Sequence, residues 1–266
     1  MTNFFDLITN YQTPTDLLLE SNRSIGEIPL KNELVLYSKF DQETGGLYLQ
    51  KDYVLWNETW GSSNLVQNQP GPFSMPNSSY QYNDSSSNVL TFYSLVPKVD
   101  LSSFSLSFYL RAIGNETFGI YQDENGINSR LRFSLLAVGT NMELHTHNSS
   151  SFSSNQTVSS FIFSNLLKPN EWTFIGLVYN STSQLLQLYD QSGNVVEMRT
   201  NVTIDPIPTR YIDVGDSYRY GVQHLFSPSS AIACLSLHDV ALTQMDMALL
   251  PCACQFKDRK LPLFLF

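Results

Sequence analysis

The chain has 266 residues, 42% of them hydrophobic and 13% aromatic, which is enough to form one substantial hydrophobic core. It carries 15 basic against 24 acidic residues, so the net charge is -9, and because no basic cluster occurs we exclude nucleic acid as a partner. No segment approaches the roughly 20 apolar residues that cross a bilayer, so we expect no membrane insertion by this segment. Residues 1–6 lack the charged and apolar regions of a signal peptide, so a secreted form would be a mature fragment or a piece of a longer protein.

The N-terminal third is predicted to hold few strands after an irregular start. Residues 1–33 form a lead-in, either with a short helix or as an irregular segment that packs on the fold. Residues 31–40 give the first secure strand. The stretch that holds Trp56, Trp60 and several prolines predicts a long surface excursion, after which residues 89–95 regain strand character.

The middle of the chain carries the clearest strand pattern. Residues 101–112 alternate strictly, which predicts a half-buried strand. One face holds Phe104, Leu106, Phe108, Leu110 and Ala112, and the other holds Ser103, Ser105, Ser107, Tyr109 and Arg111. Residues 123–126 predict a hairpin turn because they end in Asn-Gly. Residues 130–138 and 142–146 are expected to pair, and residues 158–163 to follow as a further strand.

Residues 171–179, 184–190 and 195–198 are predicted to form three successive strands. The connections at residues 180–183 and 191–194 carry the Asn, Ser and Gly residues that tight reversals need. The first of these strands is apolar on both faces, with Trp172, Phe174 and Val178 on one and Ile175, Leu177 and Tyr179 on the other. We therefore expect it in the middle of a sheet that is covered on both sides.

The C-terminal part predicts two last core strands, at residues 211–215 and 232–238, and one helix at residues 243–250. Thr243 and Asp246 have the spacing of a capping box at the start of this helix. Turn signals recur at intervals of roughly ten residues between the strands, which is typical of a two-sheet sandwich. The sequence thus predicts an all-β fold, a two-sheet antiparallel jelly-roll sandwich with one short C-terminal helix.

Three segments together resemble the laminin G-like domains, the concanavalin A-like sandwiches that also include the pentraxins. They are the strand that starts with Asn170, Glu171 and Trp172, the run at residues 34–41, and the closing run at residues 238–242 before the helix. The resemblance spans roughly residues 34–252. It implies a sandwich domain at residues 34–255, between a lead-in at residues 1–33 and a tail at residues 256–266.

The resemblance also implies a disulfide and a metal site. In many such domains a cysteine in the closing strand bonds one just after the helix, and Cys234 and Cys252 have that spacing, which leaves Cys254 over. Asp216 resembles the start of the pentraxin calcium loop, although the Glu-Gln pair and the residues that flank the strand cysteine in pentraxins are missing. Calcium is the expected cofactor, with Asp216 and Asp41 as candidate ligands, because hard cations prefer carboxylate and carbonyl oxygens.

Asparagine usage bears on the compartment. Asn-x-Ser/Thr sequons, which mark surface loops of secreted proteins, are more frequent than the Ser and Thr content alone would give. They lie at Asn22, Asn57, Asn77, Asn83, Asn115, Asn148, Asn155, Asn180 and Asn201. We expect an extracellular protein that carries glycan at several of them. The alternative is that a chain rich in Asn and Ser forms sequons by chance.

Signs of hydrolytic chemistry are weak. Glycosidases on this type of sandwich hold two carboxylates about 5 Å apart, and the sequence lacks a Glu-x-Asp-x-Glu run on one strand. The nearest pairs are Asp41 with Glu43 and Asp123 with Glu124, which indicate solvated loop charges. The sequence therefore predicts a protein that is not an enzyme.

One strand carries a possible metal cluster. Glu143, His145 and His147 alternate along it, and side chains two residues apart can bind the same ion, as in cupins. The glutamate that the cupin pattern requires a few residues later is replaced by a run of Asn and Ser. Histidines exposed at a strand end are the alternative reading of this pattern.

The leading functional hypothesis is a non-catalytic extracellular recognition or adhesion module, part of a larger secreted or cell-surface protein. It would bind a glycan or glycoprotein through rim loops, with Tyr218, Arg219 and Tyr220 as contacts, since aromatic rings stack on sugars and Arg pairs with acidic groups. The alternative for these three residues is loop packing. Two further hypotheses are a structural ectodomain spacer without a ligand, which contacts neighbouring domains, and a divergent glycan hydrolase or lyase.

Overall fold

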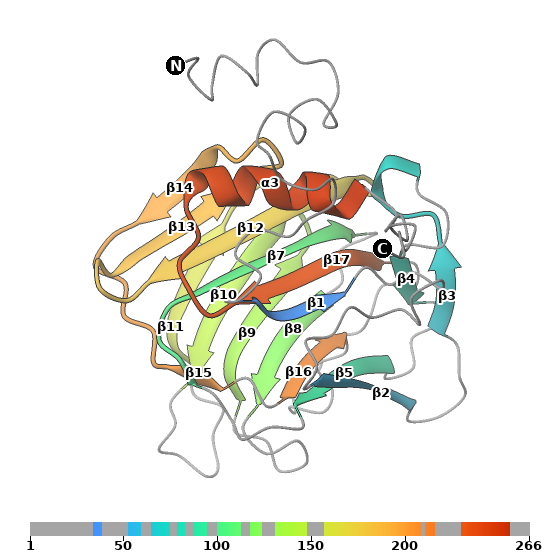
Figure 1. The fold of residues 1–266 in the computed structure, drawn as a ribbon, viewed down its shortest axis with the longest axis horizontal. Coiled ribbons are helices and arrows are strands. Elements are labelled where there is room, and N and C mark those ends of the chain that lie inside the picture. Colours follow the sequence, from blue (N-terminus) through green and yellow to red (C-terminus); the bar gives the residue numbers. More distant parts are fainter. Residues whose placement is uncertain are drawn as a thin grey trace, which may run out of the picture.

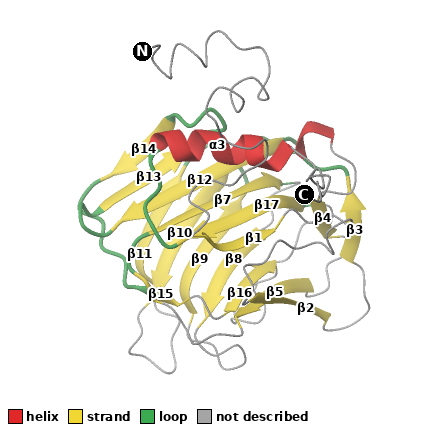
Figure 2. Ribbon diagram, in the orientation of Figure 1, coloured by secondary structure: helices red, strands yellow, loops and turns green. Residues whose placement is uncertain are grey.

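A computed structural model describes residues 34–38, 53–59, 65–74, 79–82, 88–94, 100–112, 118–123, 131–147, 157–208, 211–215 and 230–255, in some strands for the backbone alone. Antiparallel strands form two stacked sheets, and one helix lies on the outside of one of them (Figures 1 and 2). The all-β sandwich with a short C-terminal helix is therefore confirmed. The expected domain limits at residues 33 and 256 lie outside the described residues.

The larger sheet has eight strands. In spatial order they are β14 (Val195–Arg199), β13 (Leu185–Tyr189), β12 (Trp172–Asn180), β7 (Phe104–Arg111), β17 (Ala231–His238), β4 (Ser79–Tyr82) and β3 (Leu65–Gln69), and β1 (Leu34–Ser38) also pairs with β17. β12 lies between β7 and β13, as its apolar faces predicted: residues 172–179 pair with β7, and residues 176–180 pair with β13.

The second sheet has seven strands. Their order is β11 (Thr157–Phe163), β10 (Asn141–His147), β9 (Leu131–Val138), β8 (Phe118–Asp123), β16 (Tyr211–Gly215), β5 (Asn88–Ser94) and β2 (Tyr53–Thr59). A short pair, β15 (Ile207–Pro208) with β6 (Asp100–Leu101), stands apart from both sheets. The predicted pairing of residues 130–138 with 142–146 is confirmed, since β9 and β10 are hydrogen-bonded neighbours.

The surface excursion predicted around Trp56 is wrong in part. Residues 53–59 form β2 at one edge of the seven-stranded sheet, and residues 65–69 form β3 at one edge of the larger sheet. Trp56, Trp60 and the nearby prolines suggested a loop, but the period-two pattern of residues 53–59 also fits an edge strand.

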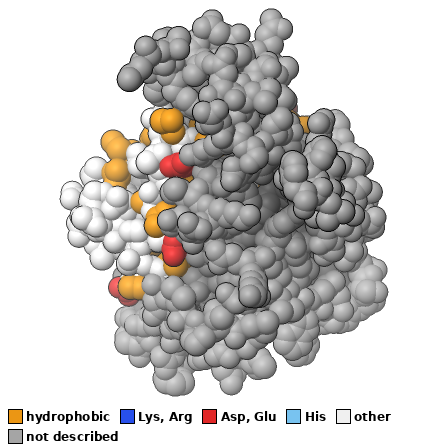
Figure 3. All heavy atoms as spheres, viewed as in Figure 1, with side chains coloured by type: hydrophobic (Ala, Val, Ile, Leu, Met, Phe, Trp, Pro, Cys, Tyr) orange, Lys and Arg blue, Asp and Glu red, His pale blue; other side chains and the backbone are white. Residues whose placement is uncertain are grey.

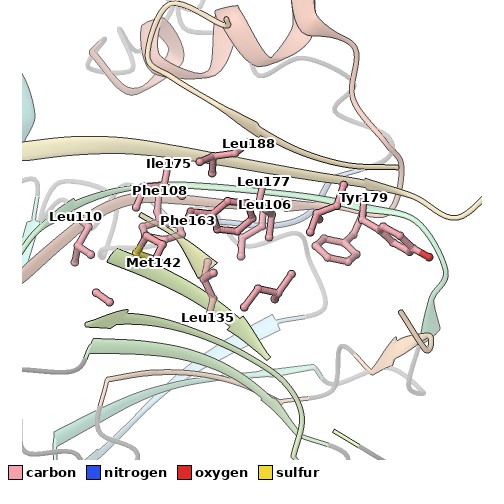
Figure 4. Close-up of a cluster of buried hydrophobic side chains, with 14 of the residues drawn as sticks. Leu106, Phe108, Leu110, Leu135, Met142, Phe163, Ile175, Leu177, Tyr179 and Leu188 are labelled. Carbon is pink, nitrogen blue, oxygen red and sulfur yellow. The ribbon is translucent and has the colours of Figure 1, made fainter. Parts of the chain in front are cut away.

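The main core fills the space between the sheets. Every second residue of β7 and β12 points inward, and these side chains meet those of β9, β10 and β11 (Figure 4). The contributors include Phe108, Leu110, Ile175, Leu177, Leu135, Met142 and Phe163, each at most 2% exposed. Tyr179 is also buried here, and its hydroxyl donates to the carbonyl of Val202 and accepts from the amide of Ile204, both at 3.1 Å. The chain after β14 is thereby fixed against the core.

A second core lies between the eight-stranded sheet and α3 (Gln244–Gln255). Tyr109, Phe174, Val178, Tyr189, Ala233, Cys234, Leu242, Met247 and Leu250 form it. Gly193 faces Ala248, and a Cβ there would collide with the backbone of the helix, whereas Gly176 leaves room for the end of the Met247 side chain. Gly193 has φ 75° in the turn between β13 and β14, so this turn both reverses the chain and makes room for α3.

The helix starts where the sequence predicted. Thr243 Oγ1 donates to Asp246 Oδ2 at 2.6 Å, and the amide of Asp246 donates back to Thr243 Oγ1 at 3.3 Å, so the capping box is confirmed. The helix ends at Gln255 rather than at Leu250, and it includes Pro251.

The prediction of a half-buried β7 is wrong, although its alternation is correct. Ser105 and Ser107 on the outer face are only 1% and 2% exposed, and the chain that follows β17 lies against Ser105. Ser105 Oγ donates to the carbonyl of Val240 at 2.7 Å and accepts from the amide of Leu242 at 2.8 Å. Ser105 therefore holds the segment before the helix in place, and Ser107 bonds to Ser236 of β17, with 2.7 Å between the two hydroxyl oxygens, rather than facing water.

A β-bulge in β17 places its cysteine. Ala233 pairs with Tyr109 and Ser236 with Ser107, so β17 has one residue more than β7 in this stretch. Cys234 has φ 54°, and both it and Ala233 belong to the core under α3, whereas Leu235 belongs to the main core. Cys234 is disulfide-bonded. Its partner lies outside the described side chains, so the pairing with Cys252 stays a prediction.

Candidate functional site

The residues proposed from the sequence for ligand and metal binding lie outside the described part of the chain. These are Tyr218, Arg219 and Tyr220 for the ligand, and Asp216 and Asp41 for calcium. β16 ends at Gly215, directly before Asp216, so the strand that leads to this loop is confirmed. The roles of the loop residues stay predictions.

Two of the sequons have described side chains. Asn201 is exposed, with φ 59° in the chain after β14. Asn180 is partly buried, and its Oδ1 accepts from the amides of Thr182 and Ser183 at 3.0 and 3.2 Å, which closes the turn after β12. Asn57 lies within β2 and pairs with Leu90, so it is not in a turn. The other sequons lie outside the described residues.

The described polar cluster of interest lies on β10. Met142 and Leu144 point into the core and are 1% and 0% exposed, so the alternate residues Glu143 and His145 face outward. His145 Nε2 and Glu143 Oε2 lie 3.1 Å apart, and the two side chains are 17% and 22% exposed. The pair is thus held together and still open to solvent.

This pair was weighed from the sequence as part of a metal site with His147. His147 is the last residue of β10, and its side chain lies outside the described set. Among the residues that the structure describes, no group of three His, Cys, Asp or Glu side chains could hold a metal ion. Among the described side chains, the site therefore consists of the His145 imidazole and the Glu143 carboxylate, which can bind polar groups of a ligand.

Backbone pairing gives this pair its surroundings. His145 lies opposite Ser160 of β11 on one side and opposite Ser134 of β9 on the other. Directly paired residues share a face of the sheet. Ser160 is exposed, so the polar surface continues onto β11, whereas Ser134 is only 2% exposed. Sequence reasoning missed this extension because strand order and register are not encoded locally. The alternation of Glu143 and His145 was the only local signal.

Apolar side chains are exposed on β14 and at the start of α3. β14 is the edge strand of the larger sheet, and Val195, Val196 and Met198 on it are 39%, 52% and 55% exposed. Met245 in the first turn of α3 is 49% exposed. Figure 3 shows apolar side chains at the surface over β14 and the start of α3. This β14 edge is a candidate contact surface.

Sequence comparisons identify no relative. No family model matches the chain, and no curated protein matches it.

Comparison with solved structures gives clear fold matches. The chain resembles the binding domain of botulinum neurotoxin serotype D, with 12% identity and a TM-score of 0.59, over 83% of this chain and 51% of that one. It also resembles the serotype G binding domain, with 14% identity and a TM-score of 0.59, over 82% and 50% of the two chains. A serotype D ligand binding domain in complex with N-acetylneuraminic acid matches at 14% identity and a TM-score of 0.58, over 83% and 50%.

At these identities the likeness shows a shared β-sandwich fold and nothing finer. The chain spans about half the length of the binding domains it resembles, since it covers 50–53% of each. Among the described helices, none has the length and apolar character needed to cross a membrane.

Proposed function

We propose that this chain is a non-catalytic extracellular recognition module that binds a glycan or a glycoprotein, as part of a larger secreted or cell-surface protein. The observation that carries the proposal is the shared fold with binding domains, one of which was solved in complex with N-acetylneuraminic acid. The resemblance of the sequence to laminin G-like domains supports the same class. The exposed sequon at Asn201 and the disulfide-bonded Cys234 fit an oxidising, extracellular compartment.

The proposed contacts in the loop after β16 are Tyr218, Arg219 and Tyr220. Tyr rings can stack on sugar rings, and Arg can pair with an acidic group of the ligand. Calcium bound by Asp216 and Asp41 would order the loops at this rim, since carboxylates are the ligands that calcium prefers.

A second candidate function is a structural spacer that contacts neighbouring domains. The observation in its favour is the β14 edge, where Val196 and Met198 are more than half exposed on a strand that pairs with β13 on one side and lies at the edge of the sheet. Exposed apolar side chains on an edge strand suit contact with another folded unit.

A glycan array probed with protein secreted from eukaryotic cells tests the proposal. We expect binding to a restricted set of glycans, with modest affinity, because shallow sites bury little area and must order their own side chains. Binding to no glycan, together with an effect of Met198→Lys on association with neighbouring domains of the parent protein, would favour the spacer.

The same protein should leave bound polysaccharides uncut. Incubation with each glycan hit, followed by a reducing-sugar assay, measures this. Release of reducing sugar that persists in Asp216→Ala but disappears when Glu43 or Glu124 is replaced would show a hydrolase instead.

A further inference from the structure

β14 leaves one edge of the larger sheet open and presents apolar side chains there. It pairs with β13 on one side, and no described strand lies on its other side. Val196 and Met198 on it are 52% and 55% exposed. A β-bulge at Val196 interrupts the start of the strand, whereas residues 197–199 pair regularly. Exposed apolar edge strands pair readily with another chain, so native proteins usually protect them.

The charges on β14 do not supply this protection. Its two charged residues, Glu197 and Arg199, form an ion pair with each other, so the strand carries no net charge. A second copy placed antiparallel about Met198 would bring Glu197 of each copy opposite Arg199 of the other. Opposite charges directly across a strand pair stabilise the pairing. By its sequence, β14 therefore suits association with a second copy of this chain.

The segment directly after β14 is anchored and presents a sequon to solvent. Val202 is 3% exposed, its amide donates to the carbonyl of Gln184 at 2.9 Å, and its carbonyl accepts from the hydroxyl of Tyr179 at 3.1 Å. Asn201 and Thr203 on either side of it are exposed. Asn201 has φ 59°, in the left-handed region that asparagine adopts more readily than most residues. The backbone at Asn201 is therefore fixed, and its exposed side chain can carry a glycan in the folded chain.

The other sequon with a described side chain is placed differently. Asn180 lies at the end of β12, two strands in from this edge. Its side chain is partly buried, and its Oδ1 accepts from two backbone amides of its own turn. The next residue, Ser181, bonds to Ser103 through both its amide and its hydroxyl, at 3.0 and 2.9 Å. Of these two sequons, Asn201 is thus the one that has an exposed side chain and lies next to β14.

We propose that Asn201 carries an N-linked glycan that covers the β14 edge and prevents this edge from pairing with a second copy of the chain. The inference rests on the extracellular compartment of the proposed function. It assigns the edge to a glycan rather than to a neighbouring domain.

The chemistry of the modification needs a lipid-linked oligosaccharide diphosphate as donor. Nδ2 of Asn201 forms a bond to C1 of the first sugar, and the bond between C1 and the diphosphate oxygen breaks. The lipid diphosphate leaves, and Nδ2 gives up one of its two protons. Asn201 thereby gains a bulky, solubilising group.

The position of Asn201 lets this group act on the edge. Three residues of chain separate it from Met198, so their Cα atoms lie at most about 11 Å apart. In the antiparallel arrangement about Met198, Asn201 of each copy falls at the end of the paired stretch. A glycan there would collide with the second copy, and the collision would occur twice because the arrangement is symmetric.

Thr203 provides the variant that tests the inference. Thr203→Ala removes the sequon while Asn201 stays in place, and Thr203→Ser keeps the sequon as the matched control. Glycopeptide mass spectrometry of the full chain secreted from eukaryotic cells measures occupancy at Asn201, and sedimentation over a concentration series measures self-association. We expect the parent chain and Thr203→Ser to carry glycan at Asn201. Thr203→Ala should self-associate with an apparent Kd at least tenfold lower than theirs.

Met198→Lys shows whether the association uses β14. Added to Thr203→Ala, it places two like charges opposite each other at the symmetry axis, so it should return the apparent Kd to that of Thr203→Ser. An endoglycosidase that leaves only the first sugar tests the same point on parent chain that has already folded. The self-association that this trimming releases should be absent in Met198→Lys.

The outcomes separate this inference from the proposed function. Glycan at other sequons with an unmodified Asn201 overturns the inference and keeps the extracellular module. Equal self-association of Thr203→Ala and Thr203→Ser, with Asn201 occupied in the latter, overturns the shielding of β14. The absence of glycan at every sequon overturns both the inference and the compartment on which it rests.

Discussion

Tyr189 is a buried residue under α3, and burial raises the pKa of its phenol above the ordinary value of 10.0. The folded state therefore keeps the proton at a pH where the unfolded chain releases it. The stability that this difference contributes is fully present below about pH 10 and is lost as the pH rises through the folded pKa. Between neutral pH and pH 11, we expect the free energy of unfolding to fall less in the Tyr189→Phe variant than in the parent chain.

Urea unfolding at a series of pH values measures this effect. Equal slopes of unfolding free energy against pH above pH 10 for the two proteins would contradict the assignment. Tyr179→Phe is a useful comparison, because the Tyr179 hydroxyl has two backbone partners and its removal should lower stability at every pH.

Ser105 holds the chain that leads into α3. Its hydroxyl serves both the carbonyl of Val240 and the amide of Leu242 in a buried position. Ser105→Ala leaves both backbone groups without this partner, so we expect a loss of about 1–3 kcal/mol in unfolding free energy. Urea denaturation gives the value.

Ser107 supplies the control for this change. Its hydroxyl lies 2.7 Å from that of Ser236, and both are buried. Replacing both serines with alanine removes donor and acceptor together, which should cost much less than Ser105→Ala. A double variant as damaging as Ser105→Ala would mean that side-chain packing, not the bonds to the backbone, dominates on this face.

At the scale of elements, the seating of α3 depends on the turn between β13 and β14. Gly193 has φ 75°, and a Cβ there would lie 2.5 Å from the Cβ of Ala248. Gly193→Ala combines backbone strain with a collision against the helix, so we expect a loss of about 1–3 kcal/mol or more. Thermal unfolding by circular dichroism measures it.

Gly139, with φ 61° in the turn between β9 and β10, separates the two causes. Gly139→Ala introduces similar backbone strain on the other sheet, away from α3. A larger loss for Gly193→Ala than for Gly139→Ala would assign the difference to the helix contact, and equal losses would assign the whole effect to φ.

The disulfide of Cys234 links the same elements by a covalent bond. If the partner is Cys252 in α3, the bond closes a loop between β17 and the helix that should stabilise the fold by about 3 kcal/mol. We expect Cys252→Ser to lower the unfolding free energy by that amount and Cys254→Ser to leave it unchanged. Peptide mapping without reduction identifies the bond directly, and a bond between Cys234 and Cys254 would show the predicted pairing to be wrong.

At the scale of the whole molecule, the calcium proposal predicts a change in stability. An ion that binds only the folded state stabilises it by mass action, so a chelator should lower the melting temperature and weaken any glycan binding that depends on the rim. Asp216→Ala should abolish this dependence while the fold stays intact. An unchanged melting temperature in chelator would remove the calcium proposal and leave the recognition module in place.

Much of the fold could be predicted from local patterns. The alternation in residues 101–112 gave β7, the two apolar faces of residues 171–179 gave a central strand, and Thr243 with Asp246 gave the start of the helix. These features depend on backbone periodicity and on bonds between residues close in sequence, which a local pattern carries. Polar residues at the turn after β12 were equally clear, since Asn180 caps its own turn.

Features that depend on distant segments could not be predicted in this way. The serines of β7 resembled a solvent-facing row, but the chain around Val240 contacts Ser105, and Ser107 bonds to Ser236 of β17. The position of Cys234 depends on a bulge that only the pairing of β17 with β7 defines. The candidate site has the same origin. Glu143 and His145 were visible as an alternating pair, but Ser160 comes from β11, and strand register alone places it opposite His145. Many of the strands, several turns and the helix cap follow from the sequence alone, because these features are local, but β2 and β3 do not. Tertiary structure decided which faces are buried and which residues share a surface, because strand order and register depend on the packing of the whole chain.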